Sequence, residues 1–247
     1  MKMEREKYFG ELVPFFKGGD MKSLLKMVVK LVVISFGVCF CSSLLMAESP
    51  DSSTLRKIVS GYGSAVVDGR LDKIEWKNGT KETISINLPN GGSTSAILLV
   101  MNDSENLYLA LKFAKLPFEV VGQSLFFEFQ NRDIDVSDSG DDVIGINPSI
   151  GFLDEVRIKG SSFIDTRKGG TIDGNGVFLE DNKQTVYEMS HPLKSPDQKH
   201  DFQLNEGDSI GFSINLRLML KEGAEYPKGY GDTRIRNILM VLAKSDN

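Results

Sequence analysis

Apolar and polar residues alternate with a period of two through most of the chain beyond residue 80. Leu107, Leu109 and Leu111 are expected on one face of a strand and their neighbours on the other, and residues 210–218 repeat the pattern. Successive side chains of a strand point to opposite faces, so the alternation predicts strands that each bury one face. The expected strands are 83–88, 95–101, 106–113, 124–130, 155–159, 177–179, 184–190, 209–218 and 234–242.

Turn-forming residues separate these strands. Clusters of Gly, Asn, Asp and Pro occur at 89–92, 102–104, 173–176 and 205–208. Many short strands between such turns, without a long amphipathic helical pattern, predict an all-β fold, an antiparallel β-sandwich of jelly-roll or immunoglobulin-like two-sheet architecture. The sequence shows no repeat and no Pro/Ser-rich break, so we expect one binding module over residues 64–247, after a polar linker over 48–63.

The N-terminal part of the chain has the pattern of an export signal. Three lysines between residues 22 and 30 precede an apolar segment, 31–47, which small and polar residues follow. This order predicts a signal peptide over residues 21–47, cleaved after Ala47. The apolar segment has about 17 residues, near the lower limit for crossing a bilayer. An uncleaved anchor is therefore the alternative, and membrane contact is expected only through this segment.

Residues 1–20 have no feature that an exported protein needs, so we interpret them as an upstream extension, with Met21 as the alternative start. Both cysteines, Cys39 and Cys41, lie in the segment that cleavage would remove. Neither cysteine has the flanking residues of a lipoprotein motif. The mature chain is therefore expected to contain no disulfide and no cysteine-bound metal.

The net charge of the chain limits which kinds of partner it can bind. Residues 1–47 hold seven of the 29 Lys/Arg and four of the 34 Asp/Glu, so the remainder has 22 basic and 30 acidic residues, a net charge of −8. An acidic surface repels nucleic acid and anionic lipid. We expect a secreted or cell-surface protein with no nucleic-acid partner, and a surface suited to calcium or neutral ligands.

Four motifs follow one another along the chain. They are Val-Asp-Gly-Arg-Leu-Asp-Lys-Ile-Glu-Trp at 67–76, Asn-Leu-Tyr-Leu-Ala-Leu at 106–111, Tyr-Glu-Met-Ser-His-Pro-Leu at 187–193 and Phe-Gln-Leu-Asn-Glu-Gly-Asp-Ser-Ile-Gly-Phe at 202–212. In order and spacing they resemble the family-9 carbohydrate-binding module and its DOMON-like β-sandwich relatives. The resemblance implies a non-catalytic extracellular module that binds carbohydrate or another extracellular polymer, with structural calcium. A structural or protein-interaction domain without sugar affinity is the alternative.

Aromatic residues are the candidates for ligand contact. Trp76, the only tryptophan, follows the Asp68-Gly69 turn and is expected to fill the end of the sandwich core, with a ligand platform as the alternative. Tyr226 and Tyr230 lie in a segment whose glycines would let a ligand approach the backbone, although this segment could equally pack on the sandwich end. The resemblance implies that two tryptophans hold the sugar between them, but this chain has a single tryptophan.

The densest acidic segment is the candidate metal site. It contains Asp133, Asp135, Asp138, Asp141 and Asp142 within ten residues. Calcium takes six to eight oxygen ligands, and closely spaced aspartates in a glycine-containing loop supply them. The segment is not an EF-hand, because its glycine is displaced and the last position would be Ile144. A solvated acidic loop without an ion is the alternative.

No enzymatic motif is present. The chain contains no Gly-x-Ser-x-Gly, no phosphate-binding loop and no His-Glu-x-x-His. The only histidines, His191 and His200, are expected to form hydrogen bonds across loops, with a metal pair or a base next to Asp201 or Asp197 as alternatives. We therefore expect a non-catalytic protein.

A haem-binding redox subunit of the same fold is an outside alternative. Met189, Met219 and Met240 are available as axial ligands, but no Cys-x-x-Cys-His accompanies them. Apolar methionines in strands are usually core residues, and these three are expected to pack.

Overall fold

The computed structural model describes residues 55–88, 92–116, 120–130, 140–220, 225–226 and 234–245. The expected signal peptide and extension lie outside these ranges. Within the ranges, no helix is both long and apolar enough to span a membrane.

One sheet, called the eight-stranded sheet, holds β1 (Arg56–Val59), β6 (Val120–Gln130), β7 (Asp142–Asn147), β8 (Gly151–Ile158), β9 (Ser161–Ile164), β12 (Ser209–Leu220), β13 (Glu225–Tyr226) and β14 (Arg234–Val241). Its order is β1-β14-β12-β6-β7-β8-β9, with β13 paired to β12. All its neighbouring strands are antiparallel except the pair β1 and β14.

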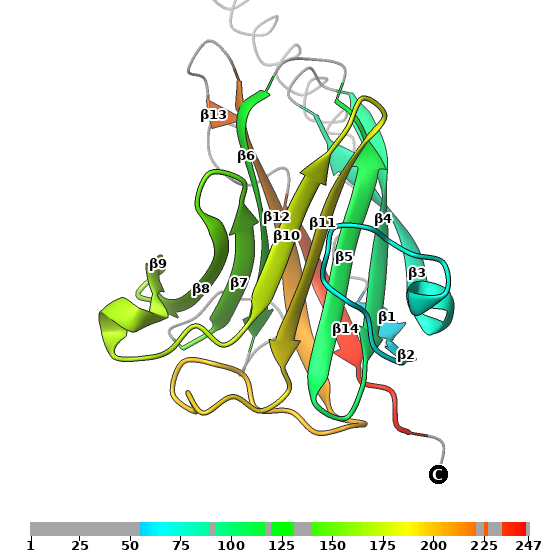
Figure 1. The fold of residues 1–247 in the computed structure, drawn as a ribbon. Helices are drawn as coiled ribbons and strands as arrows, with labels where there is room; N and C mark the ends of the chain where they lie inside the picture. Colours follow the sequence, from blue (N-terminus) through cyan, green and yellow to red (C-terminus); the bar gives the residue numbers. More distant parts are fainter. Residues whose placement is uncertain are drawn as a thin grey trace, which may run out of the picture. The chain divides into compact units, whose positions relative to one another are not determined.

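The second sheet, called the six-stranded sheet, holds β2 (Gly61–Tyr62), β3 (Thr80–Asn87), β4 (Ser93–Asn102), β5 (Asn106–Ala114), β10 (Asn175–Glu180) and β11 (Gln184–Pro192). Its order is β10-β11-β5-β4-β2, with β3 also paired to β4. Two short 3₁₀ helices, η1 (Glu75–Asn78) and η2 (Asp165–Lys168), lie in the connections. The two sheets form the layers of a sandwich (Figure 1).

The main core lies between the sheets. Leu107, Leu109 and Leu111 of β5 are buried there, and the apolar residues of β12 meet them from the other sheet. Phe129 packs against Phe202, with ring centroids 4.8 Å apart. The antiparallel sandwich and the assignment of faces in β5 and β12 are therefore confirmed.

Every strand expected from the sequence is present. Of the additional strands, β1, β2, β9 and β13 have two to four residues, whereas β7 is buried and largely apolar and was not expected. The linker expected over 48–63 is partly wrong, because β1 and β2 lie within it and Ile58 of β1 is 1% exposed in the main core. The acidic segment is not a loop throughout, because β7 begins at Asp142. Short polar strands carry too little apolar pattern to be recognised before their partners are known.

The motif at 67–76 covers the outer face of the six-stranded sheet. We call residues 64–78 the outer strap; in Figure 1 its cyan trace passes in front of β5 and β11. A second apolar cluster lies beneath it, formed by Trp76, Leu99, Met101, Tyr108 and Ala110. These sheet residues alternate with those of the main core, so they point away from it. Trp76 therefore seals the outer face of the sheet rather than the end of the core, which corrects the sequence expectation.

A buried carboxylate fastens the outer strap. Glu188 of β11 accepts hydrogen bonds from Trp76 Nε1 at 2.9 Å, from the Gly69 amide at 2.8 Å and from the Asp68 amide at 3.1 Å. Burial raises the pKa of Glu188, and these three donors oppose that rise. The Asp-Gly turn and the tryptophan of the motif thus share one acceptor.

We predict that Trp76→Ala lowers the free energy of unfolding by about 3–5 kcal/mol, because it removes a buried aromatic ring and leaves a cavity. Trp76→Phe keeps most of the packing but removes one donor to Glu188, so it should cost about 1–3 kcal/mol. Urea denaturation followed by circular dichroism measures both, since both variants lack tryptophan fluorescence. Val66→Ala, an exposed position of the same strap, is the control and should stay within about 0.5 kcal/mol of wild type. A Trp76→Ala variant as stable as wild type would contradict this role.

Candidate functional site

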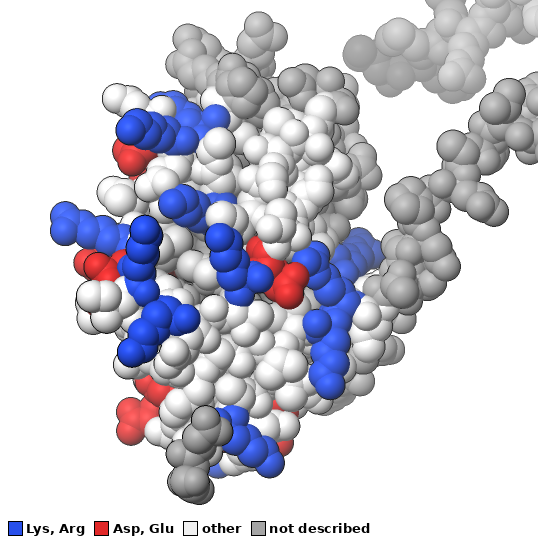
Figure 2. Space-filling model, turned by 90° about the vertical axis from the view of Figure 1, so that its right-hand side faces the viewer, with Lys and Arg blue, Asp and Glu red and all other residues white. Residues whose placement is uncertain are grey.

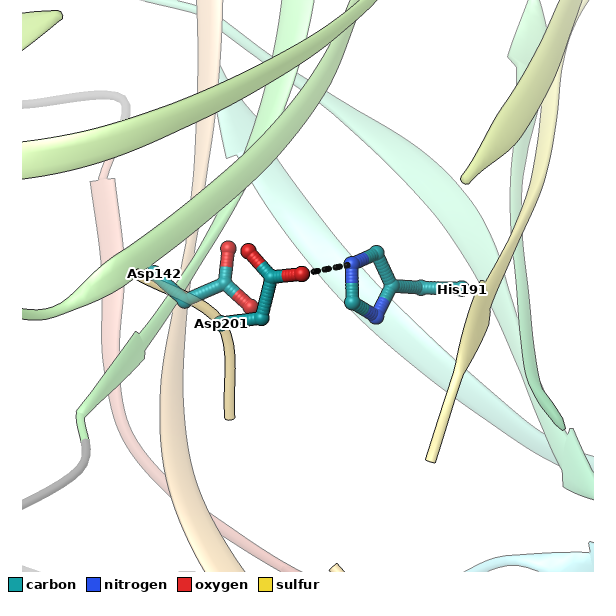
Figure 3. A group of neighbouring side chains, drawn as sticks. All are labelled: Asp142, His191 and Asp201. Atoms are coloured by element: carbon teal, nitrogen blue, oxygen red, sulfur yellow. Dashed lines mark ion pairs between the residues drawn. The ribbon is translucent and has the colours of Figure 1, made fainter. Parts of the chain in front are cut away.

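Four aspartates and one histidine gather inside the sandwich. We call them the buried cluster: Asp142 at the start of β7, Asp154 in β8, Asp165 at the start of η2, His191 near the end of β11, and Asp201 in the segment before β12. None of the five is more than 4% exposed. Figure 3 shows three of them, with the carboxylates of Asp142 and Asp201 on the side toward which the His191 ring points.

The strand pattern places these side chains inside. Asp154 is the ladder partner of Ile144, which belongs to the main core. Asp142 lies two residues before Ile144 and therefore shares its face. From the opposite sheet, the His191 ring packs against the Phe202 ring, with centroids 4.7 Å apart. Acidic side chains thus occupy positions that elsewhere in these strands are apolar.

Only part of the hydrogen-bonding capacity of the buried cluster is used. The Phe202 amide donates to Asp142 Oδ2 at 3.2 Å, and the Asp173 amide donates to Asp154 Oδ2 at 2.9 Å. The buried atoms without a hydrogen-bond partner are Asp142 Oδ1, Asp154 Oδ1, both carboxylate oxygens of Asp165 and of Asp201, and His191 Nε2. Buried polar atoms are nearly always hydrogen-bonded, so this concentration of exceptions points to a ligand of opposite charge.

The electrostatics agree with the hydrogen bonding. Burial raises the pKa of Asp142 to about 8 and that of Asp165 to about 9, and the neighbouring carboxylates add to both rises. Burial also raises the pKa of Asp201 to about 6. For His191, burial lowers the pKa but Asp154 and Asp142 outweigh it and raise the pKa to about 9. The buried cluster therefore favours added positive charge, whether protons or a cation.

The ligand atoms are close enough to share cations. Three groups of residues have such atoms within 4.8 Å of one another: Asp142, His191 and Asp201; Asp154, Asp165 and Asp201; and Asp165, Asp197 and His200. The first two groups consist wholly of the buried cluster and share Asp201. Carboxylate oxygens and imidazole nitrogens are the usual protein ligands of divalent cations, so the residues present fit a metal site.

The third group is largely satisfied without an ion. His200 Nδ1 lies 2.8 Å from Asp197 Oδ2, and the Thr171 amide donates to the same oxygen at 3.1 Å. Gly170 allows this approach, because a Cβ at that position would lie 2.0 Å from Asp197 Oδ2. The expectation that His200 forms a hydrogen bond across a loop describes this pair, whereas His191 faces unpartnered carboxylates.

The acidic segment contributes one described ligand to the buried cluster. Asp133, Asp135 and Asp138 lie outside the described residues, so their part in a metal site stays a prediction. Asp141 is buried but is not one of the grouped ligands, and Asp142 alone reaches the buried cluster. The described residues that could hold a cation thus lie mainly in the interior of the sandwich.

The other members gave weak sequence signals. Asp154 and His191 stand in strands that contain other polar residues, so neither is conspicuous in the sequence, and Asp165 and Asp201 are far apart in the chain. The sequence did indicate Asp201 as a partner for a histidine. In the structure Asp201 lies beside His191, with its Oδ2 3.7 Å from Nε2.

Three of the aromatic candidates are buried. Trp76 is 6% exposed, with its side chain packed between the outer strap and the sheet, so its ring faces are not open to a ligand. Tyr226 lies in β13, where it pairs with Leu218 of β12. Tyr230 lies outside the described residues. Tyr108 and Tyr187 are buried, and Tyr62 is half-buried, with its hydroxyl donating to Glu206 at 3.0 Å.

Comparison with solved structures identifies the architecture. A family-9 carbohydrate-binding module from Caldicellulosiruptor kristjanssonii, solved with cellotriose, matches with a TM-score of 0.54 and 16% identity, over 78% of this chain and 96% of that one. The sandwich has the fold of a family-9 carbohydrate-binding module. The same organism's module solved with glucose matches with the same TM-score and identity, over 78% of this chain and 98% of that one. No family model matches the sequence, and no curated protein does.

Proposed function

We propose that this chain is an exported, non-catalytic module that binds carbohydrate. The observation that supports it most is the family-9 module fold, which extends over nearly the whole length of modules solved with glucose and cellotriose. Glucose and cello-oligosaccharides are therefore the first ligands to test. An extracellular structural or protein-interaction domain of the same fold is the competing function.

A non-catalytic role is consistent with the described acids. Hydrolysis of a glycosidic bond needs two carboxyl groups that flank the bond, one of which transfers a proton to it. The raised pKa values belong mainly to the buried cluster, whose carboxylates are sealed from solvent and cannot reach a polysaccharide. These residues are better suited to holding a small ion than to acting on a sugar.

The charged surface also suits a neutral ligand. Figure 2 shows the face that lies to the right in Figure 1, where Lys and Arg side chains predominate over acidic ones and are separated by uncharged residues. A continuous basic stripe, which nucleic-acid binding favours, is not visible on this face. A net charge of −5 for the whole chain points in the same direction.

The haem alternative receives little support. Met189 and Met240 are buried in the main core. Met219 is 45% exposed and stands on the other face of β12 from the core residues Leu216 and Leu218. Packing accounts for Met189 and Met240, as expected from the sequence, whereas that expectation is wrong for Met219.

We further propose that Tyr226 and Tyr230 contact the sugar; Tyr226 lies in β13, which pairs with β12 near its end. Tyr226→Ala and Tyr230→Ala should each weaken binding of cellotriose by about tenfold, which corresponds to about 1.4 kcal/mol, without lowering the melting temperature. Isothermal titration calorimetry measures the affinity. Tyr62→Ala is the matched control, because Tyr62 contacts the segment at the opposite end of β12, and it should bind like wild type. If the wild-type protein binds nothing on a glycan array, the structural or protein-interaction function replaces this one.

We further propose that calcium is bound as a structural ion by Asp154, Asp165 and Asp201, an all-oxygen group. A ligand that binds only the folded state adds about 2.7 kcal/mol at a hundredfold excess over its Kd. Millimolar calcium should therefore raise the melting temperature by several degrees, and chelator should lower it. Asp165→Asn should abolish this response. The double variant Asp133→Asn/Asp135→Asn should keep it; loss of the response there instead would return the calcium site to the acidic segment.

Export is the remaining part of the proposal. Cleavage after Ala47 would leave every described strand intact, because β1 begins at Arg56. We predict that N-terminal sequencing of the secreted protein finds Glu48 as the first residue. Recovery of the chain only from the membrane fraction, with residues 21–47 retained, would show that the apolar segment is an anchor.

A further inference from the structure

His191 has the hydrogen bonding of a metal ligand. Its Nδ1 lies 2.9 Å from the backbone carbonyl oxygen of Pro192. Only a protonated Nδ1 can donate to that oxygen, so the neutral ring carries its lone pair on Nε2. Histidines that bind metals commonly donate their second N–H to a backbone carbonyl, which fixes the tautomer and the ring orientation. Nε2 of His191 is buried, without a hydrogen-bond partner, and directed at carboxylates.

The distances around Nε2 are those of two ligands on one ion. Nε2 lies 3.7 Å from Asp201 Oδ2 and 3.8 Å from Asp154 Oδ2, too far for a hydrogen bond. Two ligands at zinc-like bond lengths and a tetrahedral angle are about 3.4 Å apart. A small adjustment of these side chains would therefore admit an ion between the nitrogen and the oxygens.

Charge balance indicates two ions rather than one. The four aspartates of the buried cluster would carry four negative charges when ionised, and their ion pairs within the described residues are with His191. One divalent cation would leave two charges without compensation in a site closed to water, which is unfavourable. Two divalent cations and a neutral imidazole would balance the four charges.

The two ligand groups differ in chemistry. Asp154, Asp165 and Asp201 offer oxygen alone, which suits calcium. Asp142, His191 and Asp201 offer two carboxylates and an imidazole, which suit zinc and its neighbours in the first transition row. Asp201 belongs to both groups, and its two free oxygens allow it to bridge two ions.

We infer that the buried cluster is a mixed two-cation site, in which Asp142, His191 and Asp201 bind a zinc-type cation beside the calcium proposed above. The inference extends that calcium assignment and is independent of sugar binding. A proton is the competing occupant of Nε2, since a protonated His191 among these aspartates would also reduce the repulsion.

Cobalt(II) tests the inference, because it replaces zinc and gives visible absorption when four-coordinate. The purified protein is stripped with chelator, saturated with calcium and titrated with cobalt(II). We expect one cobalt per chain, with visible absorption that excess zinc removes and excess calcium does not. His191→Gln should weaken cobalt binding at least tenfold and keep the melting response to calcium. Asp142→Asn, the second variant, should do the same if His191→Gln fails to fold.

His200→Gln is the matched control, because His200 already pairs with Asp197 and should not bind the added cobalt. Its cobalt titration should equal that of wild type. The inference is overturned if wild type gives no cobalt absorption in the presence of calcium, if calcium displaces the cobalt, or if both the His191 and Asp142 variants bind it like wild type. A missing calcium response together with a normal cobalt titration would instead reject the calcium assignment and keep the His191 site.

Discussion

Carboxylates sealed between the two sheets impose the main electrostatic constraint on this fold, because their mutual repulsion has to be neutralised. At a separation of 4 Å, two unit charges interact by about 4 kcal/mol at an effective dielectric constant of 20. Asp142 and Asp154 come from the eight-stranded sheet, and His191 comes from the six-stranded sheet. Any group that neutralises the buried cluster therefore also ties the two sheets together. Elsewhere in the main core, the described residues pack through apolar side chains.

Strand β11 carries a buried ionisable side chain on each face, and the two side chains differ in how their hydrogen bonds are satisfied. On its outer face, Glu188 is a buried acid whose oxygens accept three N–H groups from the outer strap. On its inner face, His191 meets aspartates that lack enough protein donors. The difference explains why the strap needs no ion while the buried cluster favours one. Both arrangements depend on neighbouring residues of a single strand, so the register of β11 against β5 fixes them together.

The strands were predictable because alternation reports directly on which face is buried. Residues 106–113 and 209–218 follow that rule along their whole length, and the structure contains both. The buried cluster was not predictable in the same way. Asp154 and His191 interrupt apolar patterns only once each, and their proximity to Asp165 and Asp201 arises from contacts between distant segments. Trp76 was placed correctly as a buried residue but on the wrong surface, because the sequence does not show which sheet face the outer strap covers.

The buried cluster and Tyr226 lie toward opposite ends of the sandwich strand β12. His191 directly precedes the segment 192–194, and Asp201 lies three residues before the segment 204–206. These two segments, together with residues 104–106, line a pocket of about 560 Å³. An ion held by His191 and Asp201 would order this end of the sandwich first. Tyr226 pairs with Leu218, near the far end of β12 from Ser209. The proposed cation site and the proposed sugar contact at Tyr226 therefore lie toward opposite ends of the same strand. Changes in one should leave the other largely intact as long as β12 keeps its place between β6 and β14.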